Sequence, residues 1–92
     1  MPVRVSLTEM LVRHLALEPE FSTEARSFGD LLDRVEAEHQ GFRDSVTDET
    51  GAIRTYVNVF VNGRMLERHP RALSTRLSDG DEVYILASVA GG

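Results

Sequence analysis

The C-terminal carboxylate is the group in this chain whose position best suits it to chemistry. The chain ends in Gly91-Gly92, shortly after the run 81–87, which has the composition of a final β-strand. Glycine has no Cβ, so two in succession can pass through a channel too narrow for other residues. From Ser88 to Gly92 the chain spans roughly 17 Å at about 3.3 Å per extended residue. The carboxylate can therefore reach a partner's active site, whereas the alternative interpretation is a frayed end without a function.

Other side chains are weaker candidates for chemistry. The three histidines, His14, His39 and His69, are far apart in the sequence. Glu36-x-x-His39 has the spacing of a helical metal-ligand pair, but a di-metal site needs a second such pair, so we interpret it as a solvated helix end. No nucleophile elbow or phosphate-binding glycine loop is found. Four arginines could form a basic edge or simply be solvated: Arg64, Arg68, Arg71 and Arg76.

The composition excludes several classes of function. Among 92 residues there is no cysteine, which removes disulfides, thiolate zinc sites, iron–sulfur clusters and cysteine nucleophiles. A net charge of −5 without a basic stripe argues against nucleic acid. All ten basic residues are arginine, so no lysine of this chain could capture an activated C-terminus. Without a long apolar stretch, we expect a soluble cytoplasmic protein that does not bind a membrane. A free tail indicates a monomer, and we expect no cofactor or metal bound to the chain itself.

The first part of the chain predicts a hairpin. Residues 3–7 alternate apolar and polar side chains, as a half-buried strand does, and residues 21–25 repeat this pattern more weakly. Residues 9–19 between them have the composition of a turn region. We therefore expect two paired strands joined by a long, loose connection.

A helix is expected to begin after Ser27. Ser27 and Asp30 have the spacing of a capping box with Asp in the place of Glu. The apolar residues that follow at i, i+3, i+4 and i+7 form one stripe: Phe28, Leu31, Leu32 and Val35. Gly41 can adopt the left-handed backbone conformation that ends a helix, and Phe42 is placed to pack against the last turn of that helix.

The second half of the chain predicts strands around a crossing segment. Residues 43–54 lack periodicity and indicate a loop, whereas 57–61 indicate a central strand ended by the tight turn Asn62-Gly63. Residues 64–76 are a crossing segment with a short strand at 65–66, and Leu73 and Leu77 are its expected anchors. A turn at 78–81 leads to the last strand, 83–86. One helix covers one face of a sheet, so the fold class is α+β.

The uncovered face of this sheet is a candidate docking surface. If the apolar residues Val57, Val59, Val61, Val83 and Ile85 face the helix, the period of two points Tyr56, Phe60, Tyr84 and Leu86 the other way. These four side chains would form a patch beside the tail. The alternative is that the crossing segment covers them.

Three motifs carry a resemblance to a known family. They are Val57-Asn58-Val59-Phe60-Val61-Asn62-Gly63, Leu77-Ser78-Asp79-Gly80-Asp81-Glu82-Val83 and Val89-Ala90-Gly91-Gly92. With the order of the elements, they resemble the sulfur carrier proteins of the ThiS and MoaD family, across nearly the whole chain. The resemblance implies a ubiquitin-like β-grasp domain over residues 1–87, a mixed sheet packed on one main helix, and a flexible tail over 88–92.

The resemblance also implies a function for Gly92. In this family an E1-like enzyme uses ATP to adenylate the terminal carboxylate, which a sulfur donor converts to a thiocarboxylate. Carried over to this chain, Gly92 bears the sulfur, Gly91 leads it into the partner, and the partner contacts are Phe60, Tyr84, Leu86, Val89 and Ala90. The protein would then be a co-substrate rather than an enzyme.

The receiving pathway is a further expectation from the resemblance. The insertion 41–54 and the run 54–58 are most similar to carriers that serve cysteine biosynthesis, since thiamin-pathway carriers are shorter. In those systems the thiocarboxylate attacks an activated serine on a pyridoxal-phosphate-dependent cysteine synthase, and a metalloprotease releases cysteine. The alternatives are the small subunit of molybdopterin synthase and a ubiquitin-like modifier of target lysines. The sulfur donor and any trimming of a longer precursor stay open.

Overall fold

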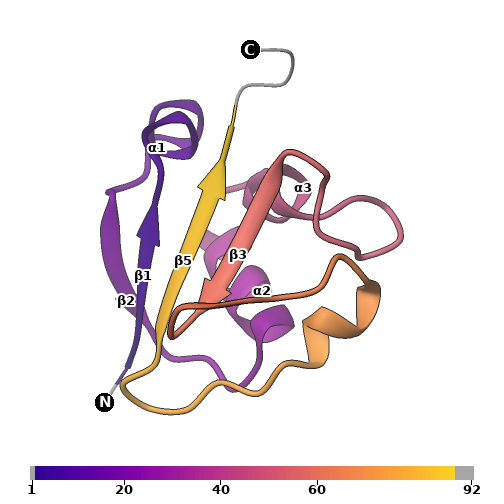
Figure 1. Ribbon diagram of the computed structural model, residues 1–92. Coiled ribbons are helices and arrows are strands. Elements are labelled where there is room, and N and C mark those ends of the chain that lie inside the picture. The colour runs from indigo at the N-terminus through magenta and orange to yellow at the C-terminus, as the bar shows by residue number, and fades with distance from the viewer. Residues whose placement is uncertain (1, 89–92) are drawn as a thin grey trace.

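The computed structural model describes residues 2–88, which form a mixed sheet with helices on one side (Figure 1). In chain order the elements are β1 (Val3–Leu7), α1 (Glu9–Leu15), β2 (Glu20–Thr23), α2 (Phe28–Glu38), α3 (Phe42–Val46), β3 (Val57–Val61), β4 (Arg64–Met65), the 3-10 helix η1 (Pro70–Ser74) and β5 (Glu82–Ala87). The strand order is β2-β1-β5-β3-β4, with β1 and β5 parallel and the other neighbours antiparallel. The predicted α+β arrangement, with α2 as the main helix across the sheet, is confirmed.

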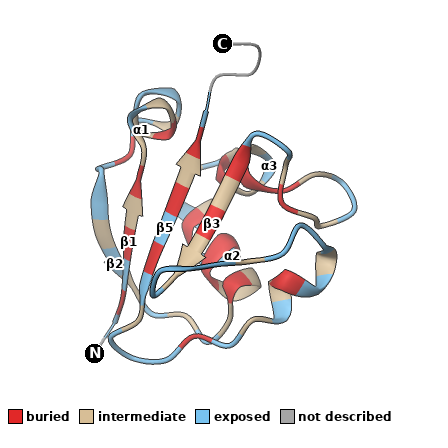
Figure 2. Ribbon diagram, viewed as in Figure 1, coloured by how far each residue is buried: buried red, intermediate tan, exposed pale blue. Residues whose placement is uncertain are grey.

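The strands follow the predicted alternation of buried and accessible side chains. Red and lighter bands alternate along β5 and β3 in Figure 2, as expected for strands that bury one face. Val59 and Ile85, opposite each other in the β3–β5 ladder, are both fully buried. Burying each such side chain stabilises the fold by about 1.5–3 kcal/mol. The central hydrophobic layer therefore lies between this face and α2.

The cap predicted at Ser27 is present, although the reciprocal bond of a capping box is shifted by one residue. The Ser27 hydroxyl accepts the Asp30 N–H at 3.0 Å, while the Asp30 carboxylate accepts the N–H of Arg26, the residue before the cap, at 3.0 Å. The predicted apolar stripe is the buried face of the helix: Phe28, Leu31, Leu32 and Val35. This element agrees with the sequence because its cap and its stripe are both local.

The prediction of a turn region at 9–19 is wrong, because α1 occupies its first part. Leu11 is buried, Glu9 and Arg13 pair at 2.6 Å one turn apart, and Ala16 ends the helix in the left-handed conformation. Seven residues are too few to show a full helical stripe. The hairpin of β1 and β2 is confirmed, and its connection contains this helix.

The prediction of a loop at 43–54 is also wrong, because α3 fills its beginning. The Glu36 carboxylate accepts the backbone N–H groups of Gly41 and Arg43 at 3.0 and 2.9 Å, and so caps α3 from α2. Gly41 has the predicted positive φ, +99°, but it is the N-cap of α3, while α2 ends earlier, at Glu38, with His39 as its C-cap. Phe42 is buried as the first residue of α3.

The strand 57–61 lies inside the sheet, but the middle position belongs to β5. Asn62 and Gly63 have φ values of 51° and 84°, which form the predicted tight turn into β4. Of the expected anchors of the crossing segment, Leu77 is buried and Leu73 is half-buried against the core. Because β5 pairs with both β1 and β3, the C-terminal strand is held on its two edges.

Candidate functional site: the end of β5 and the open face

The chain leaves the sheet at the end of β5. Ala87 pairs with Val57 of β3, and the Ser88 N–H donates to the Tyr56 carbonyl at 3.0 Å. Ser88 itself is exposed. Ser88, the first residue of the predicted tail, is thus hydrogen-bonded to the residue that precedes β3. The predicted site residues Val89, Ala90, Gly91 and Gly92 lie outside the described residues.

The other predicted contact residues lie together on the face away from α2. Phe60 and Tyr84 are opposite each other in the β3–β5 ladder, and Leu86 is two residues beyond Tyr84 on the same side of β5. Tyr84 is 41% exposed, while Phe60 and Leu86 are half-buried. Met65 of β4 is paired with Phe60, lies on the same face and is 57% exposed. It was not among the predicted contacts. We call these four residues, Phe60, Met65, Tyr84 and Leu86, the open-face patch.

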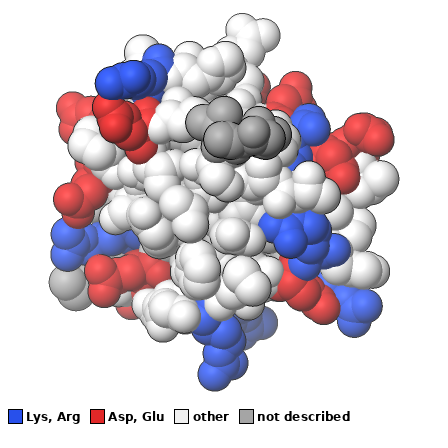
Figure 3. Space-filling view, turned by 45° about the horizontal axis from the view of Figure 1, so that its top comes forward, with Lys and Arg blue, Asp and Glu red and all other residues white. Residues whose placement is uncertain are grey.

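The open-face patch is uncharged and accessible. Figure 3 shows uncharged side chains over the centre of this view and charged side chains toward its margin. The exposure of Tyr84 and Met65 rules out the alternative that the crossing segment covers the whole face. Exposed aromatic and thioether side chains are enriched where proteins bind proteins.

Arg68 holds the crossing segment beside β3. Its guanidinium donates to the carbonyls of Arg54, at 3.1 Å, and Val57, and to the Asn58 amide oxygen at 3.0 Å. Arg71 pairs with Glu67 at 3.0 Å. Two of the four arginines considered as a basic edge are therefore engaged within their own domain, which disfavours that interpretation.

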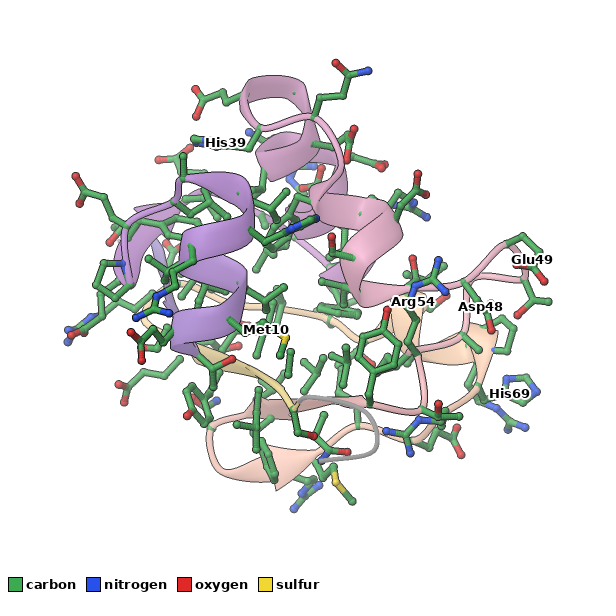
Figure 4. All side chains as sticks on the ribbon, turned by 90° about the horizontal axis from the view of Figure 1, so that it is seen from above. Met10, His39, Asp48, Glu49, Arg54 and His69 are labelled. Carbon is green, nitrogen blue, oxygen red and sulfur yellow. The ribbon has the colours of Figure 1, made fainter. Side chains whose placement is uncertain are left out.

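A small groove lies beside the end of β5. It has a volume of about 210 Å³ and is lined by Met10, Leu11, His14, Ser45, Tyr56 and Ala87. Tyr56, 39% exposed, precedes β3 and lines this groove, so the period of two does not extend to it. Seen from above in Figure 4, Met10 on α1 lies on one side of this end of the sheet and Arg54 on the other.

The remaining polar candidates have local roles. Glu36 caps α3, and the ring nitrogen Nδ1 of His69 accepts the Arg71 N–H at 3.0 Å, which caps η1. Among residues 2–88, no group of three or more His, Cys, Asp or Glu side chains is arranged to hold a metal ion. In the same part of the chain, no helix has the length and apolar character needed to cross a membrane.

Comparisons with known proteins agree on one family. Residues 11–92 match the model described as the ThiS family. The chain is 32% identical over 94 residues to the sulfur carrier protein CysO of Mycobacterium tuberculosis, with all of both chains covered. It is 39% identical over 64 residues to small archaeal modifier protein 3 of Haloferax volcanii, covering 70% of this chain and 67% of the relative.

A solved structure agrees with these relatives. A chain in the crystal structure of the Amycolatopsis orientalis BexX/CysO complex superposes with a TM-score of 0.81 at 28% identity. The superposition covers 98% of this chain and 99% of the other. The described domain therefore has the same fold as that chain.

Proposed function

The chain belongs to the ThiS family and is a ThiS/MoaD-type sulfur carrier with the ubiquitin-like β-grasp fold, and from this we propose that Gly92 carries the sulfur. An E1-like partner transfers AMP from ATP to the Gly92 carboxylate and releases pyrophosphate. A sulfur nucleophile then displaces AMP and leaves a thiocarboxylate. Activation is needed because a free carboxylate is a poor electrophile with no good leaving group.

The position of Ser88, directly after the strand that carries Tyr84 and Leu86, is the observation that supports this proposal. Ser88 is exposed at the end of a strand that is held on both edges, and the uncharged patch lies on the same sheet. A partner can dock on Phe60, Tyr84 and Leu86 while Val89, Ala90, Gly91 and Gly92 enter its active site. The protein then acts as a co-substrate, and the chemistry belongs to its partners.

We further propose that the sulfur is used to make cysteine. The support is the full-length similarity to a protein named as a CysO sulfur carrier. In this scheme the thiocarboxylate attacks an activated serine on a pyridoxal-phosphate-dependent synthase, and a metalloprotease frees the product from Gly92.

Intact-mass measurement tests the proposal. The purified protein is incubated with an E1-like adenylating enzyme, ATP and a sulfide source, and we expect the mass gain of one sulfur-for-oxygen exchange. Deleting Gly92 should abolish both this gain and AMP formation while leaving the melting temperature unchanged, since Gly92 comes five residues after the end of β5 at Ala87. AMP formation retained in the deletion variant would contradict the proposal. Isolation from cells as a stoichiometric complex with a molybdopterin synthase large subunit would contradict the shuttle role.

A second candidate function is that of a protein modifier. It is favoured by the 39% identity to a small archaeal modifier protein. The same acyl-adenylate would then react with a lysine amine of a target, which forms an amide bond and releases AMP. Covalent conjugates in cells that are lost on deletion of Gly92 would support this function, and a thiocarboxylate without conjugates would exclude it.

A further inference from the structure

Thr8 directly follows β1, at the position where the ladder between β1 and β5 lacks a backbone acceptor for the Ala87 N–H. β1 ends at Leu7, and the Thr8 N–H still donates to the Ile85 carbonyl at 3.2 Å. In a parallel ladder the next bond would run from the Ala87 N–H to the Thr8 carbonyl. That carbonyl instead accepts the first N–H groups of α1, from Leu11 at 3.1 Å and Val12 at 3.2 Å.

The Thr8 hydroxyl takes the place of this missing carbonyl. It accepts the Ala87 N–H at 3.0 Å and lies 3.4 Å from the Ala87 carbonyl oxygen, to which it can donate. A threonine at a helix N-cap usually accepts an N–H of its own helix, yet Thr8, the N-cap of α1, makes no such bond. Its hydroxyl serves β5 rather than α1.

The opposite edge of β5 is held at the same level. Val57 is the ladder partner of Ala87, and the Tyr56 carbonyl accepts the Ser88 N–H at 3.0 Å. Ala87 is therefore held from both sides, one residue before the chain leaves the sheet. The side chain of Thr8, near the start of the domain, thus makes the last hydrogen bond between β5 and the β1 side of the sheet.

We propose that Thr8 is a positioning residue, which sets the point at which the C-terminal segment leaves the sheet and so where its carboxylate is presented. This inference rests on the proposed function of Gly92. Without the hydroxyl, only the contacts with β3 hold Ala87 and Ser88, so these two residues separate from the sheet more often, and each separation lengthens the tether by roughly 7 Å at about 3.3 Å per residue. A longer tether lowers the effective concentration of the carboxylate at the partner's nucleotide.

Amide hydrogen exchange tests the anchor without any partner. Thr8→Val keeps the shape of the side chain and removes the hydroxyl, so exchange at Ala87 should rise about five- to tenfold, the worth of one hydrogen bond. Thr8→Ser should restore slow exchange. Thr23→Val makes the same change at a half-buried threonine near the other end of β1, where it should leave Ala87 unaffected. Unchanged exchange at Ala87 in Thr8→Val overturns the inference.

Adenylation kinetics then test the consequence of the anchor. With the E1-like enzyme, Thr8→Val should lower kcat about fivefold or more because the carboxylate is less well placed. The KM for the carrier should stay within about twofold, since the open-face patch is intact. Rescue by Thr8→Ser shows that the hydroxyl is responsible, and a lowered kcat with an unchanged KM separates positioning from loss of stability. Faster exchange at Ala87 with an unchanged kcat overturns the positioning role. A wild-type protein that is never adenylated refutes the proposed function instead, and the exchange experiment alone then shows whether Thr8 anchors Ala87.

Discussion

Phe60 of β3 and Tyr84 of β5 stack across the antiparallel ladder, with ring centroids 6.4 Å apart and an angle of 28° between the ring planes. Aromatic pairs of this kind add about 0.5–1.5 kcal/mol beyond the area they bury. Here the pair is not covered, since Tyr84 is 41% exposed. The stacked rings therefore present a rigid apolar surface, already ordered before a partner binds.

Truncation of this aromatic pair should weaken partner binding more than folding. For Tyr84→Ala we expect the Kd for the E1-like enzyme to rise about 30-fold, the effect of losing a 2 kcal/mol anchor. Glu24→Ala, which removes an exposed side chain just after β2, at the opposite edge of the sheet from β4, is the control and should leave the Kd unchanged. Titration calorimetry gives the Kd and thermal unfolding gives the stability. A Tyr84→Ala variant that binds as wild type would show that the partner docks elsewhere.

Loss of the α2 cap should lower the stability of the whole domain. In Ser27→Ala the Asp30 N–H loses its 3.0 Å partner, which costs about 1 kcal/mol. For a domain of this size that lowers the melting temperature by about 4–8 °C. Ser74→Ala, at an exposed serine, should change the free energy of unfolding by less than about 0.5 kcal/mol. Equal melting temperatures for both variants would mean that the cap contributes nothing.

The elements that could be predicted from the sequence are those whose signals are local. The Ser27 cap of α2 lies within four residues, and the alternation in β1, β3 and β5 lies within each strand. The same alternation correctly placed Phe60, Tyr84 and Leu86 on the open face. Met65 could have been added, because the two-residue turn at Asn62-Gly63 fixes its register opposite Phe60.

The features that were missed depend on contacts between distant parts of the chain. α3 is five residues long and is capped by Glu36, which belongs to α2. Such a short helix is not stable alone, so its own sequence carries little signal. The Thr8–Ala87 hydrogen bonds join residues 79 positions apart. Only the folded register of β1 against β5 shows that the hydroxyl of Thr8 replaces a ladder carbonyl.

The Glu36 cap should make stability depend on pH in acid. Hydrogen bonds from the Gly41 and Arg43 N–H groups hold the pKa of Glu36 below its usual range. A lowered pKa in the folded state means that the contribution is fully present above the unfolded pKa of about 4.3, and is lost as pH falls through the folded pKa. Glu36→Gln should therefore lower the free energy of unfolding at neutral pH. It should also narrow the difference between the free energies of unfolding at neutral and at acid pH.

Urea unfolding at about pH 7 and about pH 3 measures this difference. Glu38→Gln removes an exposed carboxylate from the same helix and is the control for the change in net charge. If both variants lose as much stability on acidification as the wild type, the cap does not couple α2 to α3. The pKa of Asp30 is also lowered, by its hydrogen bond from the Arg26 N–H, so part of the acid dependence should persist in Glu36→Gln.

Gly29 should resist replacement by alanine although it lies in a helix. A Cβ at Gly29 would lie 3.1 Å from the backbone oxygen of Leu73 in η1, closer than ordinary contact. Alanine is favoured over glycine in a helix by about 1 kcal/mol, and Ala37→Gly, at an exposed position of α2, measures that preference in this protein. We expect Gly29→Ala to gain none of it and to lose stability, because η1 must move away. If Gly29→Ala instead stabilises the domain by as much as Ala37→Gly destabilises it, the contact between α2 and η1 is looser than the structure indicates.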